Sequence, residues 1–441
     1  MNFRECCRAH PLILFALIGI VIRLILTPLL TRTYDVASWG ELIENIRAGE
    51  GLYDVKGYYY TPLWGYFLNV MAVITSVIPG MDTLATAADV SFSGFFPHAD
   101  TRIPTLDFAV FIKIPLIAFD VAVAYTLYRL VLKLTGDGKK AVTIFAAWML
   151  LLPAILVSSV AGMFDNLAVL LLLLSLLCLM YDRPLSAGTL LGLGVMLKVY
   201  PGLALVPMAC YILAITKDRS EKMMKCVKFL ASAIVTAAVI VLPPILKGQT
   251  SQVFYLFTSR LKGNGTSSTV TTEGLILLCG MLVLFIASFA IFRFLQRHFD
   301  NPEKSLIGSV TLIIGLAVGV TFSIQYVAEV LPLILLMLIV FDIGSKRLLI
   351  LFSALYLALI LEELPALLLT LEESTSLFSV DSLENLARSM DSGFFRDIVK
   401  PSLFLANQYM IVIMSALVVY DALFGRKNPW KIFTKSERQD V

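Results

Sequence analysis

Two carboxylates just beyond the first hydrophobic run are the residues best suited to do chemistry. Asp35 and Glu41 lie in the stretch Thr31–Leu63, which is polar, aromatic and acidic where most of the chain is aliphatic. One stripe of this stretch is apolar at helical spacing, and it consists of Val36, Trp39, Leu42, Ile43 and Ile46. The stripe predicts an amphipathic helix over 35–48 on a membrane surface, with Asp35 at its N-terminus where lipid head groups lie. A carboxylate there can accept a proton, and the simpler alternative is a solvated loop acid beside interfacial aromatic residues.

A lysine and an aspartate at predicted helix ends are the next candidates. Lys198 and Tyr200 belong to MLKVYP, a turn between two short apolar runs. The Lys198 ammonium can bind a phosphate at the membrane interface, or it can reach water along its own apolar stem. Asp165, in SSVAGMFDNL, opens a predicted helix. The simplest interpretation is that its side chain caps the N-terminus of that helix.

Other polar residues interrupt apolar runs. Gln325 and Tyr326 open a predicted helix that carries Glu329 in its first turn. Such groups are costly inside a membrane unless they are paired, which favours a functional role. Arg23, Lys113 and Asp120 lie within apolar runs, and we expect a structural ion pair of Asp120 with one of the two cations.

The composition supplies the scaffold for these side chains. Of the 441 residues, 58% are hydrophobic and only 15% are charged, and the apolar residues fall in long runs. Runs of about 18 or more residues predict membrane-spanning helices, so we predict an all-α, polytopic protein of the lipid bilayer. The net charge of +3 does not indicate a nucleic acid partner, and the six cysteines show no metal or redox spacing.

The positions of lysine and arginine predict the topology. If every basic cluster is cytoplasmic, the runs alternate across the membrane only when one of 61–79 and 107–131 does not cross. We assign the crossing to 107–131 and treat 61–79 as an interfacial or re-entrant part of one outer loop, 31–106. The alternative is that 61–79 spans. About twelve spanning helices follow, with both termini cytoplasmic.

These helices are expected to form two modules. Residues 1–246 contain the first helix, the outer loop 31–106 and the helices that follow, and they are the expected catalytic module. Residues 247–441 are the expected variable transmembrane module, with outer loops at 247–273 and at the acidic segment 362–400.

Several segments, taken in order, resemble one group of enzymes. They are DVASWGELIENIRAGEGLY with YYYTPLWGYF, then IPLIAFDVAVAYTLYRL, SSVAGMFDNL, MLKVYPGLALVP and QYVAEVLPL. They resemble the GT-C membrane glycosyltransferases, which use polyprenyl-phosphate or dolichyl-phosphate sugars, and most closely the mannosyltransferase I family of GPI-anchor synthesis. The resemblance covers residues 31–215 and returns at 325–333. It implies a GT-C-type helix bundle with a large first extracytoplasmic loop that carries interfacial helices.

The resemblance also assigns residues. The family requires an Asp-x-Asp pair in its first outer loop: the second Asp matches Asp35, a later acid matches Glu41, and the first Asp falls on Thr33. The threonine in place of the first Asp is evidence against a two-carboxylate metal site. The alternative is that Asp35 and Glu41 hold Mn²⁺ or Mg²⁺ through water molecules. The Lys-aromatic-Pro turn of the family matches the turn at Lys198, and its Gln-Tyr pair begins at Gln325.

The implied reaction is the inverting transfer of a hexose, mannose in the nearest family, from the donor to a glycolipid or glycan acceptor. Asp35 is expected to be the general base, because a base must take the acceptor proton as the phosphate leaves. Cations must stabilise that phosphate, and we expect Lys198 to do so with Arg102 and Arg260. The other expected substrate-binding residues are Tyr60, Asp165, Tyr200, Gln325, Tyr326 and Glu329.

The expected site faces the extracytoplasmic or lumenal side of a prokaryotic plasma membrane or of the endoplasmic reticulum. The alternative from another class is a polytopic transporter or lipid flippase, which often has about twelve helices. Such proteins carry broken helices at the midplane of two related halves. The sequence shows no such symmetry, and its acids gather at one face instead.

Overall fold

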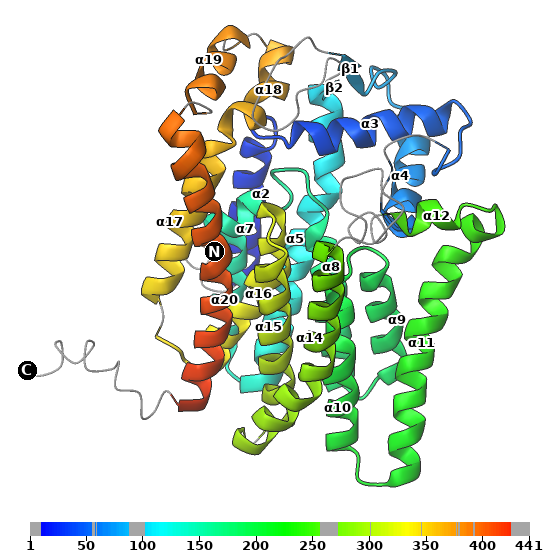
Figure 1. Ribbon diagram of the computed structural model, residues 1–441, viewed down its shortest axis with the longest axis vertical. Helices are drawn as coiled ribbons and strands as arrows, with labels where there is room; N and C mark the ends of the chain where they lie inside the picture. The colour runs from blue at the N-terminus through cyan, green and yellow to red at the C-terminus, as the bar shows by residue number, and fades with distance from the viewer. Residues whose placement is uncertain are drawn as a thin grey trace, which may run out of the picture.

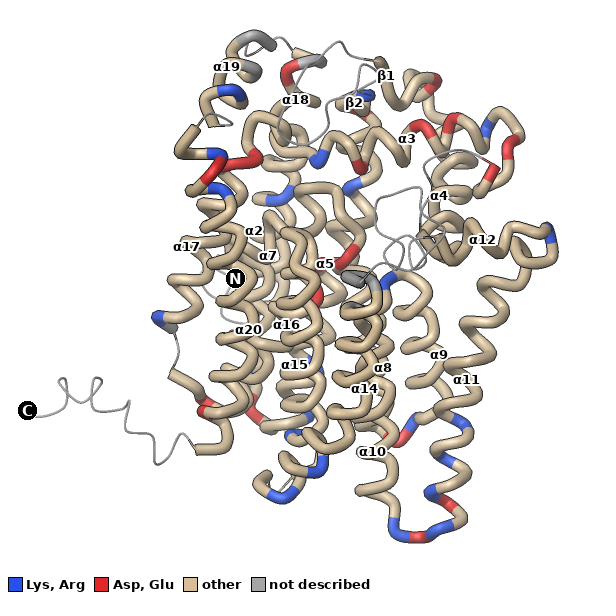
Figure 2. Tube along the Cα trace, viewed as in Figure 1, with Lys and Arg blue, Asp and Glu red and all other residues tan. Residues whose placement is uncertain are grey.

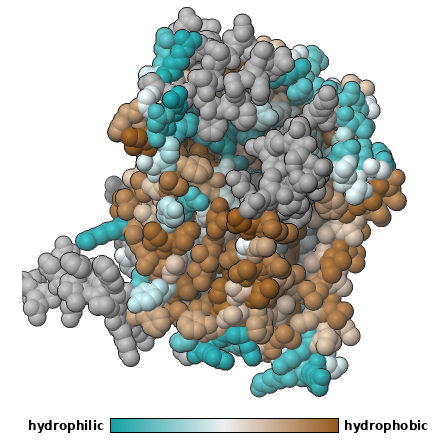
Figure 3. Space-filling view, viewed as in Figure 1, coloured by the Kyte–Doolittle hydropathy of each residue, from teal (hydrophilic) through white to brown (hydrophobic). Residues whose placement is uncertain are grey.

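The apolar runs fold into helices that stand side by side around a hydrophobic core in the computed structural model (Figure 1). The structure describes residues 10–54, 58, 60–87, 102–255, 272–299, 301–344, 346–375, 377, 380–390 and 393–424. On the face seen in Figure 3, apolar side chains form a broad band and hydrophilic residues lie above and below it. Charged residues are concentrated at the same two ends (Figure 2). This distribution is that of an integral multi-pass membrane protein, which confirms the predicted class.

Five of the described helical segments are long and apolar enough to cross a bilayer. They are Leu106–Thr135 (α5), Arg219–Leu246 (α11), Leu278–His298 (part of α14, Thr272–His298), Pro302–Val320 (α15) and Phe395–Phe424, in which the π-helix η3 (Phe395–Val399) leads into α20 (Lys400–Phe424). A sixth crossing results if α17 (Lys346–Glu362) and α18 (Leu364–Thr375) form one span that is bent by 53°.

The remaining apolar helices of the bundle are shorter. They are α2 (Pro11–Leu26), α6 (Gly138–Leu150), α7 (Leu152–Val157), α8 (Asp165–Met180), α9 (Pro184–Val195), the 3-10 helix η1 (Tyr200–Ala204) with α10 (Leu205–Ile215), and the 3-10 helix η2 (Ile324–Tyr326) with α16 (Val327–Val340). With 16 residues, α8 reaches only about 24 Å, less than the ~30 Å of a hydrocarbon layer. The number of about twelve crossings depends on such helices and stays a prediction.

Proline and glycine determine where several of these helices begin and end. Pro11, Pro62, Pro184 and Pro302 each occupy the first turn of a helix, where a missing N–H costs no hydrogen bond. Gly136 ends α5 in the left-handed conformation with φ of 68°, which glycine adopts without strain. These residues therefore divide a nearly continuous apolar sequence into separate helices.

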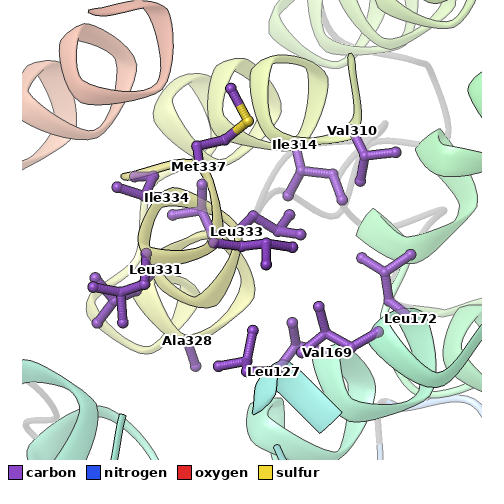
Figure 4. Close-up of a cluster of buried hydrophobic side chains, with 14 of the residues drawn as sticks. Leu127, Val169, Leu172, Val310, Ile314, Ala328, Leu331, Leu333, Ile334 and Met337 are labelled. Carbon is purple, nitrogen blue, oxygen red and sulfur yellow. The ribbon is translucent and has the colours of Figure 1, made fainter. Parts of the chain in front are cut away.

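The apolar core joins both predicted modules. Helices α5 and α8 of the first module meet α15 and α16 of the second through Leu127, Leu172, Ile314 and Leu333 (Figure 4). All four side chains are fully buried. Inside a bilayer such contacts stabilise through close packing rather than through exclusion of water. The hydrophobic core is therefore continuous across the predicted boundary at residue 246. The division into two modules stays a prediction.

A buried carboxylate connects four segments of the bundle. Asp120 of α5 accepts hydrogen bonds from Arg23 Nε of α2 at 2.9 Å, Ser158 Oγ after α7 at 2.8 Å and Asn166 Nδ2 of α8 at 3.2 Å. Arg23 and Asp120 are both fully buried, which confirms the expected structural ion pair for these two residues. Lys113, the other candidate, donates instead to backbone carbonyl groups after α2.

The predicted interfacial helix lies across one end of the bundle (Figure 1). It is α3 (Thr33–Arg47), close to the predicted 35–48, and it buries Val36, Trp39, Leu42 and Ile43. The same end of the molecule carries α4 (Pro62–Thr75), α12 (Thr250–Val253) and α19 (Val380–Met390).

A two-stranded antiparallel ribbon also lies at this end. It pairs β1 (Ala85–Ala87) with β2 (Arg102–Pro104), so that Ala85 faces Pro104. The ribbon adds two three-residue strands to the predicted helical fold. The ribbon lets the outer loop pair its own backbone groups while Ile103 is fully buried, and a three-residue strand leaves no clear periodic signal in a sequence.

Both ends of α4 remain at the α3 end of the molecule. Before α4, the Thr61 hydroxyl donates a hydrogen bond to the carbonyl of Met196, which follows α9. After α4, Arg47 of α3 donates from Nη1 to the carbonyl of Met81 at 2.7 Å. Helix α5 then carries the chain to the opposite end (Figure 1). This arrangement agrees with the prediction that 61–79 does not cross and that 107–131 does.

Ion pairs connect loops at the end away from α3. They are Lys133 with Glu303, Lys140 with Asp342, and Lys225 with Asp182. The basic loops therefore lie together at one end, as the alternation of crossings requires. That this end faces the cytoplasm stays a prediction from the distribution of Lys and Arg.

Candidate active site

Polar ends of several helices meet near α3. Asp35 lies in the first turn of α3, Asp165 opens α8, and Lys198 lies in the bend between α9 and η1. Tyr326 closes η2, and Glu329 lies in the first turn of α16. A helix end leaves backbone groups unpaired and interrupts the apolar surface, so polar side chains concentrate there. The structure thus brings together residues that are far apart in the sequence.

Lys198 is at the centre of this group. Its ammonium lies 3.2 Å from a carboxylate oxygen of Asp165, and the two side chains are 7% and 0% exposed. The rings of Tyr60, Phe164 and Tyr326 surround the ammonium, with Nζ at 5.3, 4.8 and 5.3 Å from the ring centres. Aromatic faces attract a cation, and more strongly where water is excluded. Four predicted residues, Lys198, Asp165, Tyr60 and Tyr326, thus form one enclosed cationic site together with Phe164, which was not predicted.

Glu329 and Tyr200 complete its walls. The Glu329 side chain is fully buried, and neither of its carboxylate oxygens has a hydrogen-bond partner in the described part of the chain. Glu329 lies near both Lys198 and Asp165, without an ion pair of its own to Lys198 in the described part of the chain. The hydroxyl groups of Tyr200 and Thr321 form a hydrogen bond of 2.6 Å. A buried acid without a hydrogen bond is costly, which favours a functional role for Glu329.

A second cation, Arg32, adjoins the site and is absent from the residues predicted above. Its Nη1 donates to Gln325 Oε1 at 2.7 Å, and its Nη2 lies 3.1 and 3.0 Å from the two carboxylate oxygens of Glu363. Arg32 immediately precedes α3, and Glu363 is the single residue between α17 and α18. The two partners are 331 positions apart, so no local pattern could pair them. The one available signal is that Arg32 lies within the predicted catalytic stretch Thr31–Leu63.

Asp35 is the least enclosed acid of the group. It is partly exposed, and no residue that the structure describes donates a hydrogen bond to its carboxylate. Burial raises the pKa of the Asp35 carboxyl, and the positive charges of Arg32 and Lys198 oppose that rise. The raised pKa makes Asp35 a stronger base than an ordinary aspartate.

Glu41 and Arg102, which were both predicted site residues, form a separate pair on the outer surface. The Arg102 Nε lies 3.8 Å from Glu41, and the side chains are 42% and 41% exposed. Six residues along a helix displace Glu41 by about 9 Å from Asp35 and turn it to another face. The structure therefore does not bring Glu41 or Arg102 to Lys198, and their predicted roles lose support. Arg260 lies outside the described residues.

Thr33, at the position of the first aspartate of the GT-C motif, is turned toward α18. Its hydroxyl donates to the carbonyl of Ala366 at 2.9 Å and lies 3.2 Å from the hydroxyl of Thr370. Within the described ranges, no group of three or more His, Cys, Asp or Glu side chains is arranged to hold a metal ion. Position 33, a threonine turned toward α18, therefore supplies no second carboxylate beside Asp35.

A narrow pocket opens beside Arg32. Arg32, Gln325, Tyr356 and Glu363 form its polar lining, and the rest of its wall is apolar. The apolar lining comes from Leu30, Leu156, Val157, Val160, Ala161, Met163, Ile324, Ile360 and Leu367. In this conformation the free space holds about one water molecule. Its chemistry suits an anionic head group joined to a hydrocarbon chain.

Comparison with known families identifies the class of enzyme. The profile of glycosyltransferase family 87 matches residues 106–380, more than half of the 441 residues. The chain belongs to glycosyltransferase family 87. The match confirms the coarser part of the resemblance seen in the sequence, a membrane glycosyltransferase. The closer assignment, to the mannosyltransferase I family of GPI-anchor synthesis, is not confirmed.

Solved structures similar to this family 87 transferase include two of ArnT from Cupriavidus metallidurans. The one bound to undecaprenyl phosphate has a TM-score of 0.49 and 13% sequence identity, and the similarity covers 94% of this chain and 77% of that chain. The apo-state structure has a TM-score of 0.47 and 13% identity, with coverage of 95% and 78%. No curated protein sequence matches the transferase.

The family match covers some residues of the site and not others. Asp165, Lys198, Glu329 and Glu363 lie inside the matched residues 106–380, whereas Asp35 lies in the segment before them. The match therefore says nothing of Asp35, whose carboxylate lies within the electrostatic influence of Arg32 and Lys198. The assembled site holds this partly exposed acid near two cations at the end of the apolar band.

Proposed function

We propose that this transferase moves a hexose from a polyprenyl-phosphate-linked donor to a hydroxyl group of a glycolipid or glycan acceptor. The observation that supports this most is the place of Asp35. It is an acid without a hydrogen-bond donor among the described residues, near Arg32 and Lys198, on the helix that lies across the end of the bundle. A donor anchored in the bilayer by its lipid presents phosphate and sugar at this level.

In this proposal Asp35 is the general base. The acceptor oxygen forms a bond to the anomeric carbon while its proton passes to the Asp35 carboxylate. The bond between the anomeric carbon and the phosphate oxygen breaks, and its electron pair remains on the phosphate. Attack from the side opposite the leaving phosphate inverts the configuration, so a β-linked donor gives an α-linked product. We propose mannose as the hexose, on the resemblance of the sequence segments.

Two cations stabilise the charge that develops on the leaving phosphate. Lys198 is enclosed by three rings, and Arg32 lies at the wall of the adjoining pocket. An electrostatic contact is stronger in such surroundings than in water, because little solvent screens it. In this proposal Lys198, as predicted, and Arg32 supply this charge, whereas Arg102 pairs with Glu41 and the role of Arg260 stays a prediction.

We place the reaction on the extracytoplasmic or lumenal side of the membrane. The basic loops gather at the end away from α3, and loops rich in Lys and Arg tend to stay in the cytoplasm. Both a prokaryotic plasma membrane and the endoplasmic reticulum satisfy this orientation.

The test is a transfer assay with purified protein in liposomes, radiolabelled polyprenyl-phosphate mannose and a membrane lipid extract as the source of acceptors. Asp35→Asn keeps the size of the side chain but removes the proton acceptor, so kcat should fall about 10²- to 10⁴-fold while donor binding persists. Glu50→Gln, at an exposed acid of the same segment, is the matched control and should keep wild-type turnover. Turnover near wild type in Asp35→Asn would remove Asp35 from the mechanism. A protein that only carries lipid across the bilayer would transfer no sugar at all.

A further inference from the structure

The contact between Arg32 and Glu363 lies on the wall of the pocket, and the proposed mechanism does not use its carboxylate. Glu363 presents both oxygens to one nitrogen of Arg32, at 3.1 and 3.0 Å. The other terminal nitrogen of Arg32 is held by Gln325 at 2.7 Å. The Arg32 side chain is 17% exposed and that of Glu363 is 6% exposed. One half of the guanidinium is therefore fixed by a neutral amide, and the other half is occupied by an anion.

A buried ion pair in an apolar wall contributes little to stability. Removing both charges from water costs about as much as their attraction returns. Glu363 is, in addition, the residue at which α17 and α18 meet with a bend of 53°, so its side chain lies where the helical hydrogen bonding is interrupted. The backbone around it is anchored separately, because Thr31 N donates to Leu367 O at 2.9 Å. The position of α18 therefore does not depend on the contact between Arg32 and Glu363 alone.

The geometry points to an exchange of anions. We propose that Glu363 occupies, on Arg32, the position that the phosphate of the lipid-linked donor takes, and that donor binding displaces the Glu363 carboxylate from Arg32. This inference rests on the proposed function for the nature of the donor. Carboxylate and phosphate both offer two oxygens to a guanidinium, so one can replace the other on the same hydrogen-bond donors.

The surroundings of Arg32 favour a phosphate that carries a hydrocarbon chain over a free phosphate ion. The wall next to Arg32 is formed by Val157, Val160, Ile324 and Ile360. An isoprenoid chain gains contacts along such a wall, and inorganic phosphate does not. Gln325 keeps Arg32 in place during the exchange.

The pair of Lys198 with Asp165 is a less suitable place for such an exchange. Asp165 is fully buried at the start of α8, and three rings enclose the ammonium. Displacing Asp165 would leave a charge in the interior, which is costly. Glu363 lines the pocket beside Arg32, the more exposed of the two cations, with a side chain that is 17% exposed against 7% for Lys198.

The adjacent acid provides a matched control. Glu362 has the same charge and forms its own ion pair, with Lys400 at 2.5 Å, and it does not line the pocket. Glu363→Gln and Glu362→Gln therefore remove the same charge from neighbouring positions. Glutamine at 363 can still accept a hydrogen bond from Arg32, so the fold should be retained.

The experiment measures binding of undecaprenyl phosphate to the full-length protein in nanodiscs, with inorganic phosphate as a second probe. Glu363→Gln should bind undecaprenyl phosphate about fivefold or more tightly than wild type, because no internal anion competes for Arg32. Glu362→Gln should bind it as wild type does. In an Arg32→Gln background, the effect of Glu363→Gln should disappear, and inorganic phosphate should bind weakly throughout.

Two results would overturn the inference in distinguishable ways. If wild type binds undecaprenyl phosphate but Glu363→Gln binds it equally or more weakly, Glu363 is not a competitor, while the proposed function stands. If wild type binds no polyprenyl phosphate and transfers no sugar from it, the proposed function and this inference fall together.

Discussion

At the scale of single residues, the transferase places its two site cations in contrasting surroundings. Arg32 donates hydrogen bonds to an amide oxygen and to a carboxylate, which fix the direction of its guanidinium. Lys198 is held by one carboxylate and three ring faces, which fix its position but not the direction of its N–H bonds. A lysine in such a cage can turn its donors toward a charge that moves, as the charge on a leaving phosphate does.

The raised pKa of Asp35 predicts how the stability of the protein changes with pH. Because burial raises the pKa of Asp35 above that of the unfolded chain, the ionised carboxylate lowers the free energy of unfolding at pH values above the folded-state pKa. Asp35→Asn removes this cost, so the variant should melt at a higher temperature than wild type at pH 7. The difference in melting temperature between the variant and wild type should shrink as the pH is lowered through the folded-state pKa. The side chain at position 35 is then neutral in both proteins. Thermal unfolding in detergent between pH 7 and pH 4 measures it, and a variant less stable than wild type at pH 7 would contradict the prediction.

Lys198 can be tested together with its partner. Lys198→Met alone leaves Asp165 buried without a counter-ion, which should cost about 3–5 kcal/mol and lower the yield of folded protein. Lys198→Met combined with Asp165→Asn removes both charges, so folding should recover. If Lys198 binds the donor phosphate, the double variant should still show a higher donor KM and a lower kcat. Wild-type kinetics in the double variant would show that Lys198 only neutralises Asp165.

The contacts of Thr33 predict the response to chelators. Its hydroxyl is engaged with Ala366 and Thr370 of α18, so this position does not supply a ligand beside Asp35. We expect transfer activity in EDTA to stay within a few-fold of the untreated enzyme. Complete loss in EDTA, restored by Mn²⁺ or Mg²⁺, would instead support the water-mediated ion between Asp35 and Glu41.

At the scale of elements, whether α4 crosses the membrane determines the side on which each later loop lies. Its apolar sequence could cross a membrane by composition, yet its flanking residues contact α3 and the end of α9. We predict that a cysteine at Ser76, which is exposed just after α4, reacts from the same side as a cysteine at Glu50, which is exposed before α4, and from the side opposite to a cysteine at Lys139. Labelling with a membrane-impermeant maleimide, in a background without other cysteines, measures this. Reaction of the positions at Glu50 and Ser76 from opposite sides would mean that α4 spans.

How far the sequence could predict these elements depends on the range of the interaction. The stripe from Val36 to Ile46 is local, and it predicts α3 to within two residues at either end. The turn at Lys198 and the helix start at Gln325 are local as well, and each is correctly recognised as a polar break in an apolar run. Arg32 and Glu363 meet only because α18 folds back onto the junction of α2 and α3, through the backbone bond from Thr31 to Leu367. No periodicity encodes that contact.

Glu41 shows the opposite case, in which two residues that are close in the sequence do not share a site. It shares a short segment with Asp35, and proximity in sequence suggests a common site. Six positions along a helix separate the two side chains by about 9 Å and turn them apart, so Glu41 pairs with Arg102 on the surface. A spacing of three or four would have placed them on one face.

At the scale of the whole molecule, Arg23 and Asp120 have a consequence for how the protein is made. They are separated by 97 positions, and translation at about 5–20 residues per second therefore leaves Arg23 waiting roughly 5–20 s for its counter-ion. The charge of an arginine costs about 2.5–3.5 kcal/mol at the centre of a spanning helix, and Arg23 lies in the last turn of α2, where a long side chain relieves part of that cost by reaching the membrane surface. Until α5 enters the membrane, α2 therefore holds this charge without its counter-ion. A chain truncated before residue 120 should hold α2 less stably in the bilayer than the longer chain does, because Asp120 is missing.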